Sequence, residues 1–357
     1  MENIIRSIIS EMKRIKLLDC TLRDGGYIND WKFGKGNIVY TIRELEKSKT
    51  DVLDLGFIRN EPLDENRTVY NSIESLSSLI SRKKPGITYA AMAEVLHPIT
   101  PELICKRNDS TIDVIRVIVW KNKHDEYGRV VDALQEGFEY CKMFAEKGYG
   151  LYIQPARVEQ YNDEEFIQML ELYGKLNPLA IYVVDSWGTM YSDQILHYLK
   201  LADENLDKNI AIGFHGHNNL MQAFGNAVEF ISSGVERELI VDGSVYGIGR
   251  GAGNLHSEII AKYLNEYESK NYGIEEFFNI YEKYIKDLRK EYIWGFTPAY
   301  FMTALHHANP QYGTFYGITK GISSGEINEI LENMPVEDRV LYTEKKAEAY
   351  LNQYQGV

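Results

Sequence analysis

Cysteine is scarce in this chain of 357 residues, and its three copies, Cys20, Cys105 and Cys141, are too far apart to form a CxxC pair. Their spacing argues against a disulfide framework and a structural zinc site, and it fits a reducing cytoplasm. Long apolar runs are also missing, because no stretch reaches the roughly 18 residues that a membrane helix needs. Residues 1–16 carry charges within their apolar stretch, unlike a signal peptide. We therefore expect a soluble cytoplasmic protein.

The chain also has fewer basic residues than acidic ones. Lysine and arginine together number 39, against 52 aspartate and glutamate residues, which gives a formal net charge of -13. An acidic surface repels the phosphates of nucleic acids and the headgroups of anionic membranes. We therefore expect no nucleic-acid partner and no membrane partner, whereas a small metabolite in a locally cationic pocket remains open.

Short β-type runs alternate with amphipathic stretches from residue 15 to about residue 265. Their spacing of roughly 25–40 residues fits strand–helix–strand crossovers, and their near-continuous apolar character is typical of parallel strands. The runs are residues 15–20, 52–56, 87–91, 114–119, 150–154, 180–185, 210–214 and 239–242. Eight units in about 250 residues predict an α/β fold, a closed TIM (β/α)8 barrel. The alternative is an open doubly wound sheet, but no GxGxxG follows the first run.

The β-type runs stop after residue 265. Residues 274–291 have a helical pattern, and Pro298 is typical of the first turn of another helix. Ser324 is a suitable cap for a third helix, and residues 343–354 resemble a closing one. We therefore expect a TIM-barrel catalytic domain over residues 1–265 and a helical C-terminal extension over residues 266–357 that packs on the barrel.

A metal site is predicted where the carboxyl ends of the strands converge on one mouth of the barrel. His215 and His217 end the seventh run and are two residues apart on extended backbone, so both rings face the same side. Two imidazoles and one carboxylate, with open positions left over, are a common way to hold a catalytic divalent ion. Asp24 follows the first run and is the best carboxylate partner. The alternatives are a pair of surface histidines and a turn-capping aspartate.

Other polar residues are predicted at the same mouth. Arg23, beside Asp24, offers a second cation that can stabilise a developing oxyanion or enolate. Gln154 ends the fifth run, and Arg157 just beyond it could bind a substrate carboxylate through two hydrogen bonds or form a surface salt bridge. Arg250 also has two possible interpretations, because the glycines around it could let the backbone approach a ligand or simply form a turn.

These segments resemble the signatures of the DRE-TIM metallolyase superfamily, also called the HMGL-like superfamily. The resemblance covers about residues 15–265 and consists of three motifs in family order: Thr21-Leu22-Arg23-Asp24-Gly25, His215-Gly216-His217-Asn218 and the glycine-rich segment 247–254. It implies that Asp24, His215 and His217 are metal ligands and that Arg23 stabilises an enolate. Asn254 matches an asparagine that approaches or ligates the metal in some members. The resemblance favours Mn²⁺ or Mg²⁺, while the ligand types also suit Zn²⁺ or Co²⁺.

Within the superfamily the chain is most similar to the 4-hydroxy-2-oxovalerate aldolase branch. Asp185 and Ser186 are similar to an aldolase pair near the bound keto acid, and Tyr300 would match a tyrosine that helps the catalytic base. Aldolases of this branch have a histidine, the presumed base, three residues after the metal aspartate. This chain has Tyr27 there, and an ordinary tyrosine, with a pKa near 10, is a poor base at neutral pH.

We therefore expect a metal-dependent aldolase or lyase that acts on a 2-oxo acid or aldehyde through a pyruvate-like enolate. The catalytic candidates are Arg23, Tyr27 and Tyr300, and the substrate-binding candidates are Gln154, Arg157, Asp185 and Ser186. Two alternatives stay open: a Claisen-type synthase that joins an acyl-CoA to a 2-oxo acid, and a barrel that binds metal and ligand without turnover. The resemblance also implies a homo-oligomer and, more remotely, an aldehyde dehydrogenase partner.

Overall fold

Parallel strands form the body of the molecule in this computed structural model, which describes residues 15–124 and 130–356. In order around the sheet, the strands are β1 (Ile15–Asp19), β2 (Val52–Ile58), β4 (Thr88–Glu94), β5 (Val114–Val119), β8 (Gly150–Pro155), β9 (Ala180–Asp185), β10 (Ala211–Gly216) and β11 (Leu239–Gly243). Because β1 pairs in parallel with both β11 and β2, the sheet closes on itself. The predicted TIM barrel is confirmed, and the alternative of an open doubly wound sheet is wrong.

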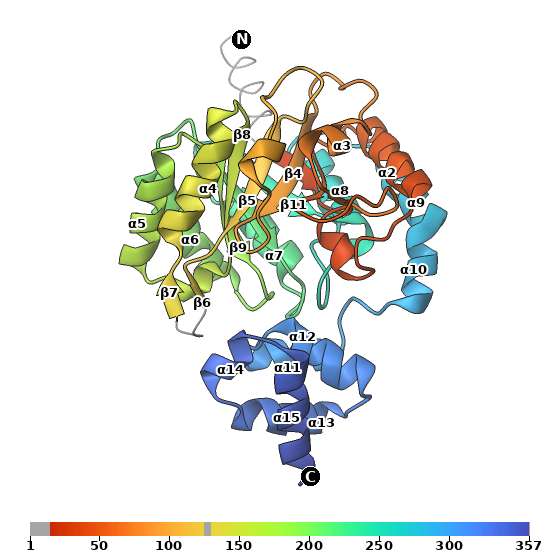
Figure 1. Cartoon of the computed structure of the whole chain (residues 1–357), viewed down its shortest axis with the longest axis vertical. Coiled ribbons are helices and arrows are strands. Elements are labelled where there is room, and N and C mark those ends of the chain that lie inside the picture. The colour runs from red at the N-terminus through yellow and green to blue at the C-terminus, as the bar shows by residue number, and fades with distance from the viewer. Residues whose placement is uncertain (1–14, 125–129, 357) are drawn as a thin grey trace.

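Helices surround the barrel and connect most of its strands (Figure 1). They are α2 (Lys35–Lys47), α3 (Ile73–Ser77), α4 (Leu134–Glu146), α5 (Asp163–Gly174), α6 (Ser192–Asn205), α7 (Ala223–Ile231) and α8 (Ser257–Tyr267). After β4 the described residues contain only a short 3-10 helix, η2 (Pro101–Leu103), in place of an α-helix. The barrel therefore has one crossover without its usual helix.

Several short elements were not predicted. A two-residue strand, β3 (Val69–Tyr70), pairs with the end of β2, and β6 (Asn122–His124) forms an antiparallel hairpin with β7 (Val130–Asp132). Three further 3-10 helices follow strand ends: η1 (Asp24–Tyr27), η3 (Val158–Gln160) and η4 (Val245–Gly247). Short irregular elements of this kind lack the periodic apolar pattern on which a sequence-based prediction depends.

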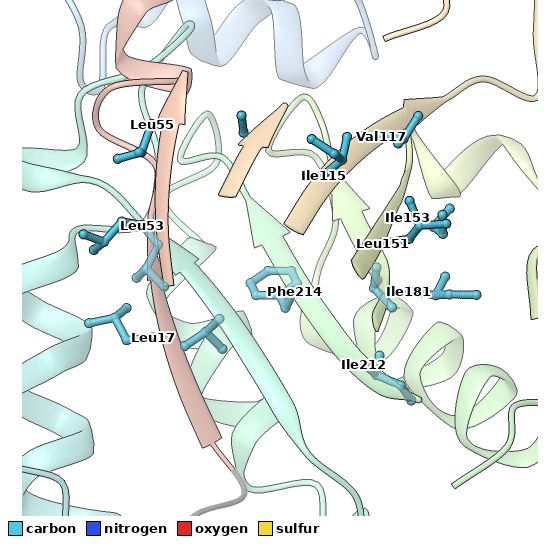
Figure 2. Packing of buried hydrophobic residues seen from close by; sticks show 14 of the residues in the cluster. Leu17, Leu53, Leu55, Ile115, Val117, Leu151, Ile153, Ile181, Ile212 and Phe214 are labelled. Carbon is cyan, nitrogen blue, oxygen red and sulfur yellow. The ribbon is translucent and has the colours of Figure 1, made fainter. Parts of the chain in front are cut away.

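Both faces of the barrel strands are buried, which explains their near-continuous apolar sequences. One face packs against the helices in the main hydrophobic core; Figure 2 labels Leu17, Leu53, Leu151, Ile181 and Phe214 among its residues. Alternate residues point into the barrel. There they form a smaller cluster that includes Leu18, Val52, Val114, Tyr152, Tyr182 and Ile240.

The chain after α8 contributes to two different cores. The segments α9 (Glu275–Ile280), η5 (Tyr281–Ile285, a π-helical turn) and α10 (Lys286–Glu291) precede Trp294, and Phe277, Ile285 and Trp294 all belong to the main core. A separate core begins at Ala299. It unites α11 (Pro298–Leu305), α12 (Pro310–Gly313), η6 (Thr314–Thr319, π-helical), α13 (Ser324–Asn333) and α15 (Glu344–Gln355), and the short helix α14 (Val336–Val340) lies between the last two in the chain. The core changes at about residue 295 rather than at the expected boundary of residue 265, because the apolar faces of α9 and η5 pack against the barrel.

The segments α11 to α15, here called the helical domain, lie on the side of the barrel where the β6–β7 hairpin is found (Figure 1). The loop after β11 approaches this domain closely, because a Cβ added to Gly251 would lie 3.1 Å from the Pro310 Cβ. No helix among the described residues has the length and apolarity to cross a bilayer. The expectation that the N-terminal segment is not a signal peptide concerns residues 1–16, and residues 1–14 lie outside the described part of the chain.

Candidate metal centre and active site

Asp24, His215 and His217 come together at the carboxyl ends of the first and seventh barrel strands, and all three side chains are buried. Their ligand atoms lie within 4.8 Å of one another. Asp24 Oδ2 is 3.8 Å from His215 Nε2, and Asp24 Oδ1 is 4.0 Å from His217 Nε2. Because metal–ligand bonds to nitrogen and oxygen are about 2.0–2.2 Å long, gaps of this size suit an ion placed between the three groups.

The pKa values of the cluster suit metal binding, which needs a neutral imidazole and an ionised carboxylate. Burial lowers the pKa of His217 to about 3, even though Asp24 pulls it upward. Burial works against ionisation of Asp24, but the Arg23 guanidinium and then His217 outweigh it and hold the pKa of that carboxyl well below its usual range. At neutral pH both residues are therefore in their ligating forms.

His215 is oriented by a carboxylate on the neighbouring strand. Its Nδ1 lies 3.0 Å from Oδ2 of Asp242 in β11, which leaves Nε2 facing the cluster. Burial opposes the charge on Asp242, but Arg116 outweighs it and lowers the pKa of that carboxyl. A carboxylate that accepts from the second nitrogen of a histidine fixes the tautomer and strengthens metal binding. Asp242 was not among the site residues predicted from the sequence.

Replacing Asp242 by asparagine is expected to weaken divalent-metal affinity by roughly 10–100-fold, the usual effect of losing such a partner. The amide is a weaker acceptor for the His215 Nδ1–H, so the ring is less well held and less basic. Titration calorimetry of the metal-stripped wild type and variant with Mn²⁺ would measure the difference. Thermal unfolding of both metal-free proteins is the control for a simple loss of stability, and equal affinities would contradict the role given to Asp242.

Asn254 lies beside the cluster. Its Nδ2 donates to Asp24 Oδ1 at 2.9 Å and to the Ile248 carbonyl at 3.0 Å. Its Oδ1 is buried and has no hydrogen-bond partner among the described residues. A buried acceptor is costly when unpaired, so this oxygen fits a group that would occupy the centre of the site. The donor set of one carboxylate, two imidazoles and an adjacent amide suits a divalent ion with open positions.

A chain of buried charges runs through the barrel beneath the cluster. Arg23 donates from Nη1 to Asp24 at 2.5 Å and from Nε to Asp54 at 3.1 Å. Arg116 then donates to Asp54 at 2.6 Å and also to Asp242. Asp54, Arg116 and Asp242 were missed in the sequence analysis. The available signal was a charge at an inward position of an apolar strand, two residues after Val52, Val114 and Ile240 respectively.

A cavity of about 580 Å³ lies over the cluster, between the barrel mouth and the helical domain. The predicted site residues that line it are Arg23, Asp24, Tyr27, Gln154, Arg157, Ser186, His215 and His217. Arg250 lines it too, as do Trp120 and Trp187, and the helical domain contributes Asn309, Glu337, Val340 and Leu341. The structure thus brings most of the predicted residues to one cavity, and the helical domain adds a wall that was not predicted from the sequence.

Two predicted site residues lie elsewhere. The Asp185 carboxylate accepts from the backbone N–H groups of Thr189 at 2.9 Å and Met190 at 3.2 Å, so it closes the turn after β9. Burial raises the pKa of Asp185 to about 7. Tyr300 lies within the helical domain, where its hydroxyl is 3.2 Å from Thr314 Oγ1. The structure therefore does not bring these two side chains to the cavity.

The walls of the cavity are aromatic and cationic. The Tyr27 ring packs edge-on against Trp31, with 4.9 Å between centroids, and burial raises the pKa of its hydroxyl. The Arg157 guanidinium carbon lies 3.5 Å from the centre of the Trp187 ring, and its Nε donates to Glu159 at 2.9 Å. Tyr27 is therefore a neutral phenol at neutral pH, able to donate a hydrogen bond.

A buried Asp–His–His cluster at the carboxyl ends of a closed parallel barrel places the protein among the (β/α)8 enzymes with a potential divalent-metal site. The family model described as HMGL-like matches residues 14–280. The chain belongs to the HMGL-like family, within the DRE-TIM superfamily, and it is a lyase-type enzyme. The predicted family resemblance is confirmed.

Individual relatives agree with this assignment. A 4-hydroxy-2-oxovalerate aldolase from Geobacillus genomosp. 3 is 26% identical over 321 residues, which cover 85% of this chain and 88% of the relative. The HMG-CoA lyase structure from Bacillus subtilis has a TM-score of 0.59 and 17% identity, over 77% of this chain and 93% of that one. The carboxyl transferase domain of Rhizobium etli pyruvate carboxylase has a TM-score of 0.67 and 15% identity, over 98% and 62% respectively. At these identities the two structures show similarity of fold alone.

Proposed function

We propose that this protein is a divalent-metal-dependent aldolase that cleaves or forms a carbon–carbon bond of a 2-oxo acid through a pyruvate-like enolate. The observation that carries the proposal is the position of Arg23, which lines the same cavity as Asp24, His215 and His217 and lies 2.5 Å from Asp24. The relatives named 4-hydroxy-2-oxovalerate aldolase support a 4-hydroxy-2-oxo acid as the substrate class.

Asp24, His215 and His217 would hold the ion, with Asn254 Oδ1 beside them. Likeness to the superfamily favours Mn²⁺ or Mg²⁺, and the imidazole ligands also accept Zn²⁺ or Co²⁺. When bound, the ion supplies Lewis-acid polarisation of the ketone of the substrate.

Arg23 stabilises the negative charge that develops on the oxygen of the enolate. Its guanidinium is held on one side by Asp54 and on the other by Asp24, so it does not need to reorganise during the reaction. In cleavage, the 4-hydroxyl loses its proton, its oxygen becomes the aldehyde oxygen, and the electrons of the C3–C4 bond pass into the enolate. Condensation reverses each step, and the new alkoxide takes up a proton.

Among the described residues, Tyr27 is the tyrosine that lines the cavity, and we assign it to the hydroxyl proton. During condensation the neutral phenol donates its proton to the alkoxide and becomes a phenolate, and in the reverse direction this phenolate form takes the proton of the 4-hydroxyl during cleavage. Replacing Tyr27 by phenylalanine is expected to lower kcat by roughly 10²–10⁴-fold, the range found for general acid–base groups. Tyr300→Phe, placed in the helical domain, is the matched control. Wild-type kcat in the Tyr27→Phe protein would remove Tyr27 from the mechanism.

Proton exchange tests the proposed function directly. The purified protein with Mn²⁺ should exchange the methyl protons of pyruvate in D2O, followed by NMR, and should release pyruvate from 4-hydroxy-2-oxo acids. A chelator should stop both reactions, and restored Mn²⁺ should recover them. Free thiol release from acetyl-CoA and a 2-oxo acid, without pyruvate exchange, would favour the Claisen-type alternative. Metal binding with neither reaction would favour a barrel without turnover.

A further inference from the structure

We infer that the carbonyl compound that reacts with the enolate carries an anionic group, and that Arg250 binds this group in the cavity between the metal centre and the helical domain. The inference rests on the proposed function and extends it to the second substrate. Arg250 would act as a specificity-determining residue.

Among the described residues, Arg250 differs from the other arginine and lysine side chains that line the cavity, because each of those forms an ion pair. The paired ones are Arg23 with Asp24, Lys123 with Glu136, and Arg157 with Glu159. No carboxylate in the described part of the chain forms an ion pair with Arg250, and its buried Nε has no hydrogen-bond partner there. A partly buried guanidinium without an anion is costly, and the planar fork of donors matches a carboxylate or a phosphate.

The backbone holds Arg250 between the two parts that enclose the cavity. On one side, a Cβ added to Gly249 would lie 2.7 Å from Asp24 Oδ1, so the loop rests directly on the metal centre. On the other side, Gly251 lies against Pro310 of the helical domain. Two residues without side chains are required for these close approaches, and they fix where the side chain between them begins.

The Arg250 guanidinium lies on the cavity wall next to the Tyr27 ring. Its central carbon lies 5.0 Å from the centre of the Tyr27 ring, a cation–π distance. Tyr27 is the residue assigned to the hydroxyl that forms at the carbon of the second substrate. Arg250 is therefore placed beside the part of the substrate that lies beyond the 2-oxo acid.

The remaining polar groups on the wall are compatible with an anion. Gln154 is 4% exposed, and its Nε2 has no hydrogen-bond partner among the described residues. Of the wall carboxylates, Glu94 is neutralised by Arg59 at 2.6 Å. Glu337 lies on an exposed part of the helical domain, where solvent and salt screen its charge. An acceptor-only group such as a carboxylate or phosphate would use the donors of Arg250 and Gln154.

The test compares acceptors of different charge in condensation with pyruvate. The acceptors are butanal, succinic semialdehyde and glyceraldehyde 3-phosphate, and product is measured by chromatography and mass spectrometry. Wild-type kcat/KM is expected to be higher for at least one anionic acceptor than for butanal. Arg250→Met should lower kcat/KM for that acceptor by about 10–100-fold, mainly through KM, because a hydrogen bond to a charged group contributes about 1.5–3 kcal/mol.

Lys123→Met is the matched control, because it removes a cavity-lining cation that already has a carboxylate partner. It should leave the ratio of anionic to neutral acceptor unchanged. The carboxylate and phosphate arms decide which anion is recognised. The inference is overturned if the wild type has no preference for either anion, or if Arg250→Met lowers kcat/KM equally for all three acceptors. Pyruvate proton exchange by the wild type is measured in parallel: exchange without anion preference overturns the inference alone, whereas absence of exchange overturns the proposed function as well.

Discussion

Alanine in place of Asp24 or His217 is expected to abolish both pyruvate proton exchange and carbon–carbon cleavage. Each substitution removes one of the three side chains that converge within 4.8 Å, and two remaining ligands would hold a divalent ion poorly. The loss of Lewis-acid stabilisation is worth several kcal/mol, so the rate should fall by about 10³-fold or more. Bound metal, determined by elemental analysis after gel filtration, should fall in parallel with the rate.

A matched substitution separates this effect from a general response to losing a histidine. His197 lies on α6, is exposed and pairs with Asp163, so His197→Ala makes the same chemical change away from the cavity. That variant should retain both metal and activity. Asp24→Asn complements Asp24→Ala, because it preserves the volume next to Arg23 while removing the charge. Full turnover by either Asp24 variant or by His217→Ala would contradict the assigned metal centre.

Arg116→Met is expected to destabilise the protein by about 3–5 kcal/mol, the usual cost of removing one partner from a buried ion network. The Arg116 side chain is fully buried and donates to both Asp54 and Asp242. Methionine fills much of the same volume but leaves the buried Asp54 with Arg23 as its remaining cation and the buried Asp242 with only the His215 ring. Urea unfolding of the metal-free proteins, followed by circular dichroism, would measure the change.

Restoring charge balance should recover part of that stability. In the double variant Arg116→Met/Asp54→Asn, one of the two carboxylates that lost Arg116 is made neutral, so the combined loss should be smaller than the sum of the single losses. Lys290→Met is the surface control, because Lys290 and its partner Asp287 are both exposed, and its unfolding should be indistinguishable from that of the wild type. An Arg116→Met protein as stable as this control would show that the network contributes little.

Several features of the site follow from local sequence. His215 and His217 occupy alternate positions near a strand end, and the period of two along a strand places both rings on one face whatever the rest of the fold does. Arg23 and Asp24 follow shortly after the first apolar run, so a closed barrel places them at the same end as the two histidines. The spacing of the apolar runs was sufficient to predict the barrel itself.

The structure differs from the sequence-based predictions where contacts between distant segments decide the outcome. Asp185 lies at a strand end, as the candidate metal ligands do. Its carboxylate, however, accepts hydrogen bonds from backbone N–H groups of the turn that follows. Tyr300 is buried beside Gly313 and Thr314 of the helical domain, and no local sequence pattern indicates which part of the fold will bury it. Contacts between distant segments also place Phe277 and Trp294 in the main core, outside the barrel strands. The change from one core to the other therefore comes later in the chain than the boundary expected at residue 265.

The sequence by itself determined the fold class, the family and the candidate metal ligands, because these depend on periodicity and on motifs that span a few residues. Tertiary structure alone decided that Asp54, Arg116 and Asp242 join Arg23 and His215 in one charge network, since inward residues meet only when their strands become neighbours around the barrel. It also decided that the helical domain closes the cavity and that Arg250 faces it without a counter-ion among the described residues. Whether a charge is paired depends on distances in space, and sequence separation carries no information about them.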